Sequence, residues 1–288
     1  MDVSHLASSV QPIALLSAAE RIAYCDQPVW IKTTTNSSFN NSLESMIRLS
    51  SWGCCSCMAL IGISGIGKTT MIERAQRLIN TPDSTPIMTI DLAPYGRYLD
   101  LQQIFLTELG FTESVKSLCT ASGIKQIKER IKQKNISVCI LDEGNALAGT
   151  KYALVQPNNT YLRALANPDI GLSVVVAGTE ELKAHLGIDP QLRSRFSVWE
   201  VPSWEAESVD FSRFLKAFVR FIPLQKPSVL DTKEIQVALV NACMGSTRNI
   251  RYVLIAAAKL AIESGQEFID LDLLEVAFDM GLADFGLI

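Results

Sequence analysis

The sequence is poor in histidine, which restricts the metal sites it can form. Its 288 residues include only two histidines, His5 and His185. Cys54, Cys55 and Cys57 form a cluster, but no second Cys or His pair lies nearby to complete the ligand set of a zinc site. We therefore interpret the cluster as small residues leading into a buried strand. The other cysteines lie in apolar contexts typical of buried thiols in a reducing compartment.

Long apolar runs and an excess of basic residues are also lacking. The longest apolar candidate, residues 54–66, is too short to span a bilayer and contains several Gly and Ser residues. No positively charged stretch followed by an apolar core marks a secretion signal. These absences predict a cytoplasmic protein with no membrane partner. The formal net charge of -4 excludes a uniformly basic surface, but is compatible with a local basic patch or with a groove built by several subunits.

Between residues 57 and 201 the sequence contains a regular alternation of apolar strands and helices. Runs of strand length occupy 58–63, 86–92, 136–141, 172–177 and 196–201. Helical patterns occupy 68–80, 100–109 and 124–134, the last with Ile124, Ile127 and Ile131 along one face. Continuous apolar strands separated by helices predict an α/β fold whose parallel sheet lies between helices.

The segments on either side of this core have different patterns. Residues 1–50 are predicted to form a mixed N-terminal segment, with a helix near 14–24, a loop rich in Thr, Ser and Asn at 33–42, and a short helix at 43–49. After Pro202 the patterns are helical and predict a small helical domain, at 205–219, 232–243, 248–263 and 270–278. We therefore expect three parts: 1–50, 51–202 and 203–288.

An eight-residue segment beginning at Gly62 matches the phosphate-binding pattern G-x-x-x-x-G-K-[ST] in full. Gly62, Gly65 and Gly67 permit a tight loop whose backbone N–H groups form an anion-binding nest at a helix N-terminus. Lys68 is expected to contact the β- and γ-phosphates, and Thr69 to offer its hydroxyl to Mg²⁺. The other residues of the predicted ATP site in this segment are Ser64, Ile66 and Thr70. Because the segment lies between an apolar strand and a helix, a simple glycine-rich turn has little weight.

Two acidic residues follow the apolar run that ends at Leu141. Asp142 is expected to hold Mg²⁺ through its water shell, and Glu143 to polarise the water that attacks the γ-phosphate. Many strands end in acidic residues at a turn, so the pair is informative only because a phosphate-binding loop precedes it. Together the two motifs predict an ATPase that uses ATP and Mg²⁺.

Three weaker positions are also candidates for contact with the nucleotide. Thr179 ends a strand, where its hydroxyl would contact the water or γ-phosphate, cap the helix beginning near Glu180, or do both. Arg195, with Arg193 in reserve, precedes the fifth strand, a position that suits an arginine finger acting on a neighbouring subunit's nucleotide. A surface charge is the other interpretation of these arginines. Arg248 opens a helix of the small domain and either reaches back to the phosphates or faces solvent.

In this order, the motifs resemble those of the AAA+ ATPases and, more narrowly, of the transposition ATPases called TniB and TnsC. The segments that carry the narrower resemblance are 141–143, 176–180, 189–196 and 245–248. The resemblance covers residues 43–278, but only the nucleotide motifs are specific. Family members often carry Ile or Ala and then His or Asp after the Asp-Glu pair, whereas Gly144 and Asn145 follow it here.

The resemblance implies an AAA+ P-loop NTPase core followed by a small α-helical lid domain. It also implies that the subunits oligomerise on double-stranded DNA in the ATP state, as rings or helical filaments. Such proteins recruit a DDE transposase and a TniQ-type target selector, and ATP hydrolysis disassembles them.

The residues themselves give limited support for DNA binding, in two segments. Tyr95 and Arg97 place aromatic and basic groups on a predicted loop, which corresponds roughly to where relatives touch the DNA backbone. Lys125 belongs to a lysine stripe opposite the apolar face of its helix. An ordinary exposed surface explains both segments equally well. If either segment lined a filament, its repetition in every subunit would multiply a modest attraction to phosphate.

Two other functions are compatible with the sequence. The first is a signalling or scaffold P-loop NTPase that assembles on protein partners without DNA, which the acidic composition slightly favours. The second is a small-molecule P-loop kinase, which would have no evident need for the helical C-terminal part or for the arginines before the fifth strand. We rank the transposition regulator first, the scaffold NTPase second and the kinase third.

Overall fold

The computed structural model describes residues 2–112 and 121–280. The chain divides into two compact units, one formed by residues 35–202 and the other by residues 1–34 together with 203–288. The predicted N-terminal segment, residues 1–50, is thus shared between the units. Within the described ranges, no helix is both long and apolar enough to cross a membrane.

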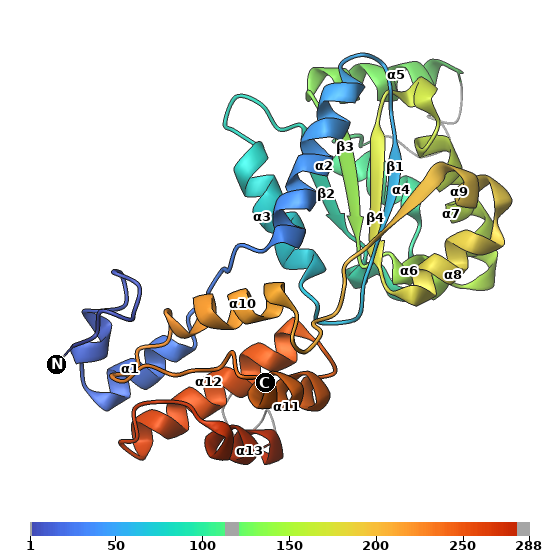
Figure 1. Cartoon of the computed structure of the whole chain (residues 1–288). Coiled ribbons are helices and arrows are strands. Elements are labelled where there is room, and N and C mark those ends of the chain that lie inside the picture. Colours follow the sequence, from blue (N-terminus) through green and yellow to red (C-terminus); the bar gives the residue numbers. More distant parts are fainter. Residues whose placement is uncertain (1, 113–120, 281–288) are drawn as a thin grey trace. The chain divides into compact units, whose positions relative to one another are not determined.

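Residues 35–202 contain a five-stranded parallel sheet in the order β2-β3-β4-β1-β5 (Figure 1). Its strands are β1 (Cys57–Ile61), β2 (Ile87–Asp91), β3 (Val138–Asp142), β4 (Ser173–Gly178) and β5 (Phe196–Glu200). The three central strands are buried along their whole length, whereas the edge strands are partly exposed. Full burial of the centre is expected of a parallel sheet covered on both faces. The predicted α/β fold is confirmed.

Helices cover both faces of this sheet. On one face lie α2 (Thr34–Ser50) and α3 (Lys68–Ile79), and on the other α4 (Leu101–Glu108) and α7 (Tyr152–Leu165) (Figure 1). In the described part of the unit, the other helices are α5 (Ala121–Gln133), α6 (Asn145–Ala148), α8 (Glu180–Ile188) and α9 (Pro190–Arg195), with short 3₁₀ turns η2 (Ala93–Tyr98) and η4 (Pro168–Ile170). On α5, Ile127 and Ile131 are buried as predicted, but Ile124 is 44% exposed.

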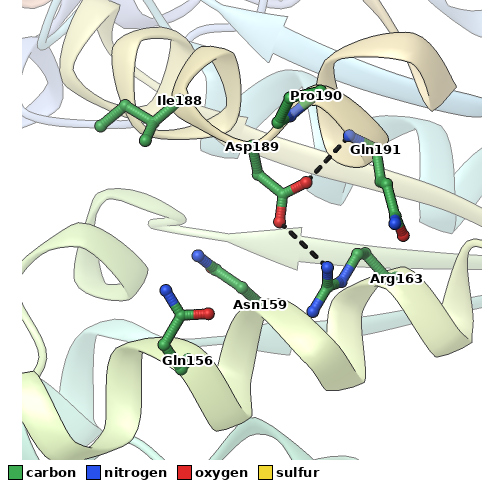
Figure 2. A pocket seen from close by; sticks show the side chains of 7 residues that line it. All are labelled: Gln156, Asn159, Arg163, Ile188, Asp189, Pro190 and Gln191. Carbon is green, nitrogen blue, oxygen red and sulfur yellow. Dashed lines mark hydrogen bonds and ion pairs between the residues drawn. The ribbon is translucent and has the colours of Figure 1, made fainter.

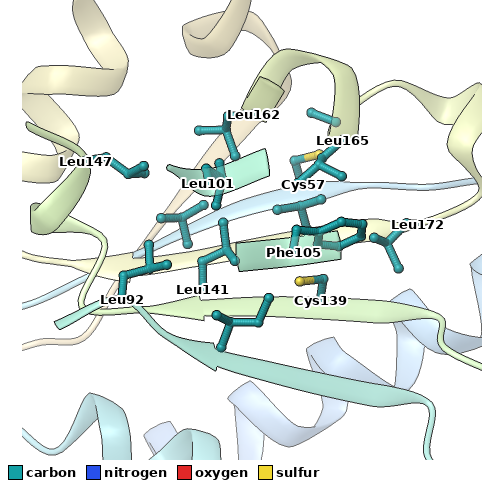
Figure 3. Close-up of a cluster of buried hydrophobic side chains, with 14 of the residues drawn as sticks. Cys57, Leu92, Leu101, Phe105, Cys139, Leu141, Leu147, Leu162, Leu165 and Leu172 are labelled. Carbon is teal, nitrogen blue, oxygen red and sulfur yellow. The ribbon is translucent and has the colours of Figure 1, made fainter. Parts of the chain in front are cut away.

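A dense apolar layer fills the space between the sheet and the helices α4 and α7 (Figure 3). Phe105 of α4, Leu162 of α7 and Leu141 of β3 are fully buried within it. Each such side chain contributes about 1.5–3 kcal/mol on burial. Burial also raises the pKa of the Cys57 thiol to about 11 and that of Cys139 further, so both stay protonated at neutral pH. This layer fixes β3 and therefore the position of the acidic pair at its end.

The predicted loop at residues 33–42 is wrong, because residues 34–42 form the first half of α2. Phe39, Leu43 and Met46 recur at helical spacing and are all buried. The ring of Phe39 lies with its centroid 5.8 Å from that of Trp199 on β5. Packing against the sheet therefore outweighs the low intrinsic helix propensity of Thr, Ser and Asn.

The second unit is the predicted helical lid domain, enlarged by the N-terminal residues. Its helices are α1 (Ala18–Cys25), α10 (Val209–Val219), α11 (Lys233–Cys243), α12 (Thr247–Glu263) and α13 (Leu271–Asp279), with a 3₁₀ turn η1 (Ile13–Leu15). Trp204 is half-buried and packs against the unit's apolar core, where its ring stacks on that of Phe214 with centroids 4.8 Å apart. Two ion pairs attach the N-terminal residues to it, Arg21 with Glu267 and Asp26 with Lys259.

The Arg21–Glu267 pair is a bidentate interaction in a buried environment. Arg21 Nη1 and Nη2 donate to Glu267 Oε2 and Oε1 at 2.6 and 2.7 Å, and the N–H of Gln225 also donates to Oε2. Burial alone would raise the pKa of Glu267, but the hydrogen bonds from Arg21 and Gln225 outweigh it and hold the pKa below the ordinary glutamate value. The ionised carboxylate is therefore favoured in the folded state.

Glu267→Gln is expected to lower the free energy of unfolding by about 1.5–3 kcal/mol at pH 7, because charge-assisted hydrogen bonds are removed. The folded-state pKa is lower than the unfolded one, so this contribution is complete above about pH 4.3 and disappears as pH falls through the folded-state pKa. Urea unfolding at a series of pH values measures the difference in free energy of unfolding between the wild type and Glu267→Gln. This difference should become smaller as pH is lowered from 5 towards 3. Glu263→Gln, on the exposed end of α12, is the matched control. An equal effect of both substitutions would contradict the role of the pair.

Candidate nucleotide-binding site

The glycine-rich segment after β1 forms a tight loop that leads into α3. Gly65 and Gly67 have φ values of 74° and 105°, a left-handed conformation that glycine adopts at little cost. Lys68, the first residue of α3, donates from Nζ to the carbonyl oxygens of Gly62 and Ile63 at 2.8 and 3.1 Å. The loop thus combines a helix N-terminus with an ammonium group, which together favour a bound phosphate.

Hydrogen bonds tie both this loop and the turn after β3 to the end of β4. The N–H of Gly62 donates to the carbonyl oxygen of Gly178 at the end of β4, at 3.1 Å. The N–H of Gly144, just beyond β3, donates to the carbonyl oxygen of Ala177 at 2.7 Å. Because β4 lies between β1 and β3, the phosphate-binding loop and the acidic pair are both bonded to the same strand end.

The two acidic residues differ in exposure and backbone conformation. Asp142 is only 5% exposed, and its Oδ1 accepts a hydrogen bond from the N–H of Glu143 at 2.9 Å. Glu143 is exposed and has a φ of 52°, a left-handed conformation that costs a non-glycine residue about 1–3 kcal/mol. A Cβ at Gly144 would lie 2.5 Å from Val176 Cγ1, so the turn after Glu143 passes too close to β4 for any side chain.

Thr179 lies directly before α8 and is half-buried. Of its two predicted roles, the capping one has no counterpart in the structure, because its side chain makes no hydrogen bond to the first turn of α8. The hydroxyl is instead 2.9 Å from Nδ2 of Asn145, and the N–H of Thr179 donates to Asn145 Oδ1, also at 2.9 Å.

The two candidate finger arginines lie on α9, whose start is fixed by Asp189. Figure 2 shows the Asp189 carboxylate between the N–H of Gln191 and the guanidinium of Arg163 on α7, beside a pocket of about 370 Å³. The distances are 2.9 Å to the Gln191 nitrogen and 3.5 Å to Arg163 Nη1. Arg193 and Arg195 are both exposed, and Arg195 Nη1 donates to the carbonyl oxygen of Arg163 at 2.9 Å. Both guanidinium groups are therefore accessible at the end of α9.

Arg248 belongs to the other unit, on the first turn of α12, where it is exposed. Its contact with the phosphates stays a prediction.

Tyr95 and Arg97 lie on η2, directly after β2, and a second segment of the chain joins them there. The N–H of Lys151 donates to the carbonyl oxygen of Arg97 at 3.0 Å, and Lys151 Nζ lies 3.9 Å from the ring centroid of Tyr98. Tyr152, the next residue, is 94% exposed. We call these five residues the Tyr98–Lys151 patch. It combines two positive charges with three exposed aromatic rings.

Lys125 lies at the opposite end of the sheet from this patch. Helix α5 crosses the end where the strands begin, whereas α6 and α8 lie at the end where they finish (Figure 1). Just beyond α5, Asn135 Nδ2 donates to Ser84 Oγ, which precedes β2. The Lys125 side chain is 78% exposed and is 3.9 Å from Glu129. The structure therefore does not bring Lys125 together with the other two predicted DNA contacts.

The oxygen donors of the site fit a magnesium nucleotide. Thr69 offers a hydroxyl on the exposed first turn of α3, and Asp142 offers a carboxylate at the end of β3. Mg²⁺ prefers such oxygen ligands and takes most of the others from phosphates and water. In the part of the chain that the structure describes, no three His, Cys, Asp or Glu side chains form a metal cluster. Thr69 and Asp142, as two oxygen donors, suit a metal that enters with its nucleotide.

Several known proteins are similar to this chain. The family model described as "Bacterial TniB protein" matches residues 21–206, whereas no curated protein matches. Similar solved structures include the Aeropyrum pernix ORC2 protein, with 13% identity, 93% of this chain and 74% of that chain covered, and a TM-score of 0.60. Drosophila ORC bound to DNA is 14% identical, with 94% of this chain and 68% of that chain covered and a TM-score of 0.59. The Thermotoga maritima RuvB branch migration motor is 15% identical, with 88% of this chain and 71% of that chain covered and a TM-score of 0.53. At such identities the likeness shows the fold alone, which is that of AAA+ ATPases.

Proposed function

Because the chain belongs to the TniB family, we propose that it is an ATP-hydrolysing regulator of DNA transposition. With ATP and Mg²⁺ it assembles as a ring or helical filament on double-stranded DNA and links a TniQ-type target selector to a DDE transposase. Hydrolysis of ATP then disassembles it. One observation carries this proposal: hydrogen bonds hold the ends of β1, β3 and β4 side by side. These strand ends bear the phosphate-binding loop, the acidic pair and Thr179, respectively.

Each group at these strand ends has a role in hydrolysis. The backbone of residues 62–67 and the ammonium of Lys68 hold the phosphates, and Thr69 with Asp142 holds Mg²⁺. Glu143, exposed beyond the buried Asp142, polarises the attacking water. Arg195 of one subunit reaches the nucleotide of its neighbour, so that hydrolysis depends on assembly.

The Tyr98–Lys151 patch supports contact with DNA. Arg97 and Lys151 offer cations to phosphates, and exposed aromatic rings pack on sugars or bases. One of the solved structures with the same fold, Drosophila ORC, is itself bound to DNA. Repetition of the patch in every subunit would give a multivalent contact with the duplex, which reconciles a net charge of -4 with DNA binding.

The proposal is tested by electron microscopy of the protein with duplex DNA, comparing a non-hydrolysable ATP analogue with ADP. We expect rings or filaments on the DNA with the analogue and bare DNA with ADP. Bare DNA in both samples, with the analogue still bound to the protein, would point to a scaffold NTPase that assembles on protein partners. Pull-down of a TniQ-type selector and a DDE transposase by the assembled form tests the partners.

Replacing Arg97 and Lys151 together by alanine is expected to weaken DNA binding. A plot of the logarithm of the DNA association constant against the logarithm of salt concentration has a negative slope. The magnitude of this slope should decrease by about one for each phosphate that the variant no longer neutralises. Fluorescence anisotropy over a salt series measures both quantities, with the ATP analogue present throughout. Lys125→Ala is the comparison variant at the other end of the sheet. If only Lys125→Ala changed the slope, the DNA would contact α5 instead of the patch.

A further inference from the structure

Asn145, two residues after Glu143, makes paired contacts with Thr179. Its side-chain amide faces both the N–H and the hydroxyl of that residue, with two contacts of 2.9 Å. Asn145 is the first residue of α6, while Thr179 follows β4. One side chain therefore bridges the turn that carries the proposed water-polarising glutamate and the strand end that carries the candidate hydroxyl.

The direction of each hydrogen bond follows from the chemistry of the groups. A backbone N–H can only donate, so the Asn145 atom that faces Thr179 N must be the oxygen Oδ1. The amide nitrogen Nδ2 then faces the hydroxyl and donates to it. The Thr179 hydroxyl is thus an acceptor towards Asn145, and its own proton points elsewhere. Across residues 2–112 and 121–280, the structure shows no protein acceptor for that proton.

Two glycines make this close approach possible. A Cβ at Gly178 would lie 2.6 Å from Asn145 Oδ1, and a Cβ at Gly144 would lie 2.5 Å from Val176 Cγ1. The N–H of Gly144 also donates to the Ala177 carbonyl oxygen at 2.7 Å. Three hydrogen bonds thus connect the turn 143–145 to the end of β4. A small displacement of Thr179 would be transmitted to Glu143.

We propose that Asn145 is a positioning residue, which directs the Thr179 hydroxyl proton towards the γ-phosphate or the attacking water. The inference rests on the proposed ATPase function. By donating to the hydroxyl oxygen, Asn145 leaves the proton of Thr179 available for an anionic oxygen that gains charge during hydrolysis. Through the same contacts it keeps Thr179 and Glu143 in one fixed arrangement. In this role Asn145 acts through Thr179 and not by its own contact with the nucleotide or the water.

The inference predicts that Asn145→Ala lowers kcat for ATP about tenfold, with the KM for ATP unchanged. The loss of one oriented hydrogen bond from the transition state corresponds to roughly this tenfold change, since a factor of ten in rate equals about 1.36 kcal/mol. Thr179→Val, which removes the hydroxyl but keeps the size of the side chain, should lower kcat by at least as much. In the Thr179→Val background, Asn145→Ala should have a clearly smaller effect, because the hydroxyl it directs is gone and only the contact with the N–H of residue 179 is left to lose.

A double-mutant cycle on steady-state kcat and KM, with the wild type, both single variants and the double variant, tests this coupling. Equal effects of Asn145→Ala in both backgrounds would overturn it, and so would a wild-type kcat for Asn145→Ala. Asn145→Asp keeps the acceptor for Thr179 N–H, and so the local fold. Its second oxygen accepts from the hydroxyl, so we expect kcat to fall in this variant as well. A wild-type kcat for Asn145→Asp would also contradict the proposal. Absence of hydrolysis by the wild type would instead remove the proposed function itself.

Discussion

Glu143→Gln is expected to lower ATP hydrolysis by about 10²–10⁴-fold while leaving ATP binding intact. The amide has the size of the carboxylate, so the left-handed turn at this residue is equally strained in both proteins. It has no negative charge and cannot polarise or deprotonate water. The phosphate-binding loop, Lys68 and Asp142 are unchanged, and these are the groups that we propose to hold ATP and Mg²⁺.

The same substitution should preserve assemblies on DNA, because ATP binds but is not turned over. Electron microscopy of samples aged with ATP measures their persistence, and release of inorganic phosphate measures turnover. Glu181→Gln is a matched control, since it makes the same change of charge on the exposed first turn of α8, two residues after Thr179. Assemblies of Glu143→Gln that disappeared as quickly as those of the wild type would show that Glu143 has another role.

Arg195→Ala is expected to lower hydrolysis by about 10³–10⁵-fold, the usual contribution of an arginine finger. Within its own subunit the guanidinium contacts only the carbonyl oxygen of Arg163 among the described residues, an exposed hydrogen bond that is easily exchanged. The Asp189 carboxylate anchors the start of α9 and presents the side chain at the surface. Arg195→Ala should therefore leave the fold and ATP affinity unchanged.

A mixing experiment shows whether Arg195 acts on the neighbouring subunit. Arg195→Ala subunits keep Glu143, and Glu143→Gln subunits keep Arg195. In a mixed assembly, a site is complete wherever an Arg195→Ala subunit holds the nucleotide and a Glu143→Gln neighbour supplies Arg195. This is the case at half of the contacts between the two kinds of subunit. Phosphate release from the mixture should exceed that of either variant alone. No recovery would exclude action between subunits. Arg193→Ala, two residues earlier on the same helix, is the comparison variant, and a larger decrease there would transfer the role to Arg193.

The motifs of the candidate nucleotide site are recognisable in the sequence because their chemistry is local. The spacing of Gly62, Gly67 and Lys68 determines a loop, and the apolar run before Asp142 determines a buried strand. The TniB resemblance and the α/β fold with its helical lid are confirmed. The order of the strands then places these motifs together, although they are more than seventy residues apart in the sequence.

Other features depend on contacts that no local pattern contains. The stretch 33–42 is polar, and only the burial of Phe39 against Trp199 shows why it is helical. Asn145 departs from the family pattern, but its bonds to Thr179 join residues 34 positions apart. Lys151 likewise meets Tyr98 only in the folded chain. Nothing in the pattern of residues 1–34 indicates that they complete the helical unit.

The division of the helical unit between both ends of the chain sets an order of events during synthesis. Arg21 and Glu267 are separated by 246 residues, and all five strands of the sheet lie between them. At about 5–20 residues per second, roughly 12–50 s pass between the synthesis of Arg21 and that of Glu267, its ion-pair partner. The nucleotide-binding unit is complete on the ribosome well before the helical unit, so translation itself orders the folding of the two parts.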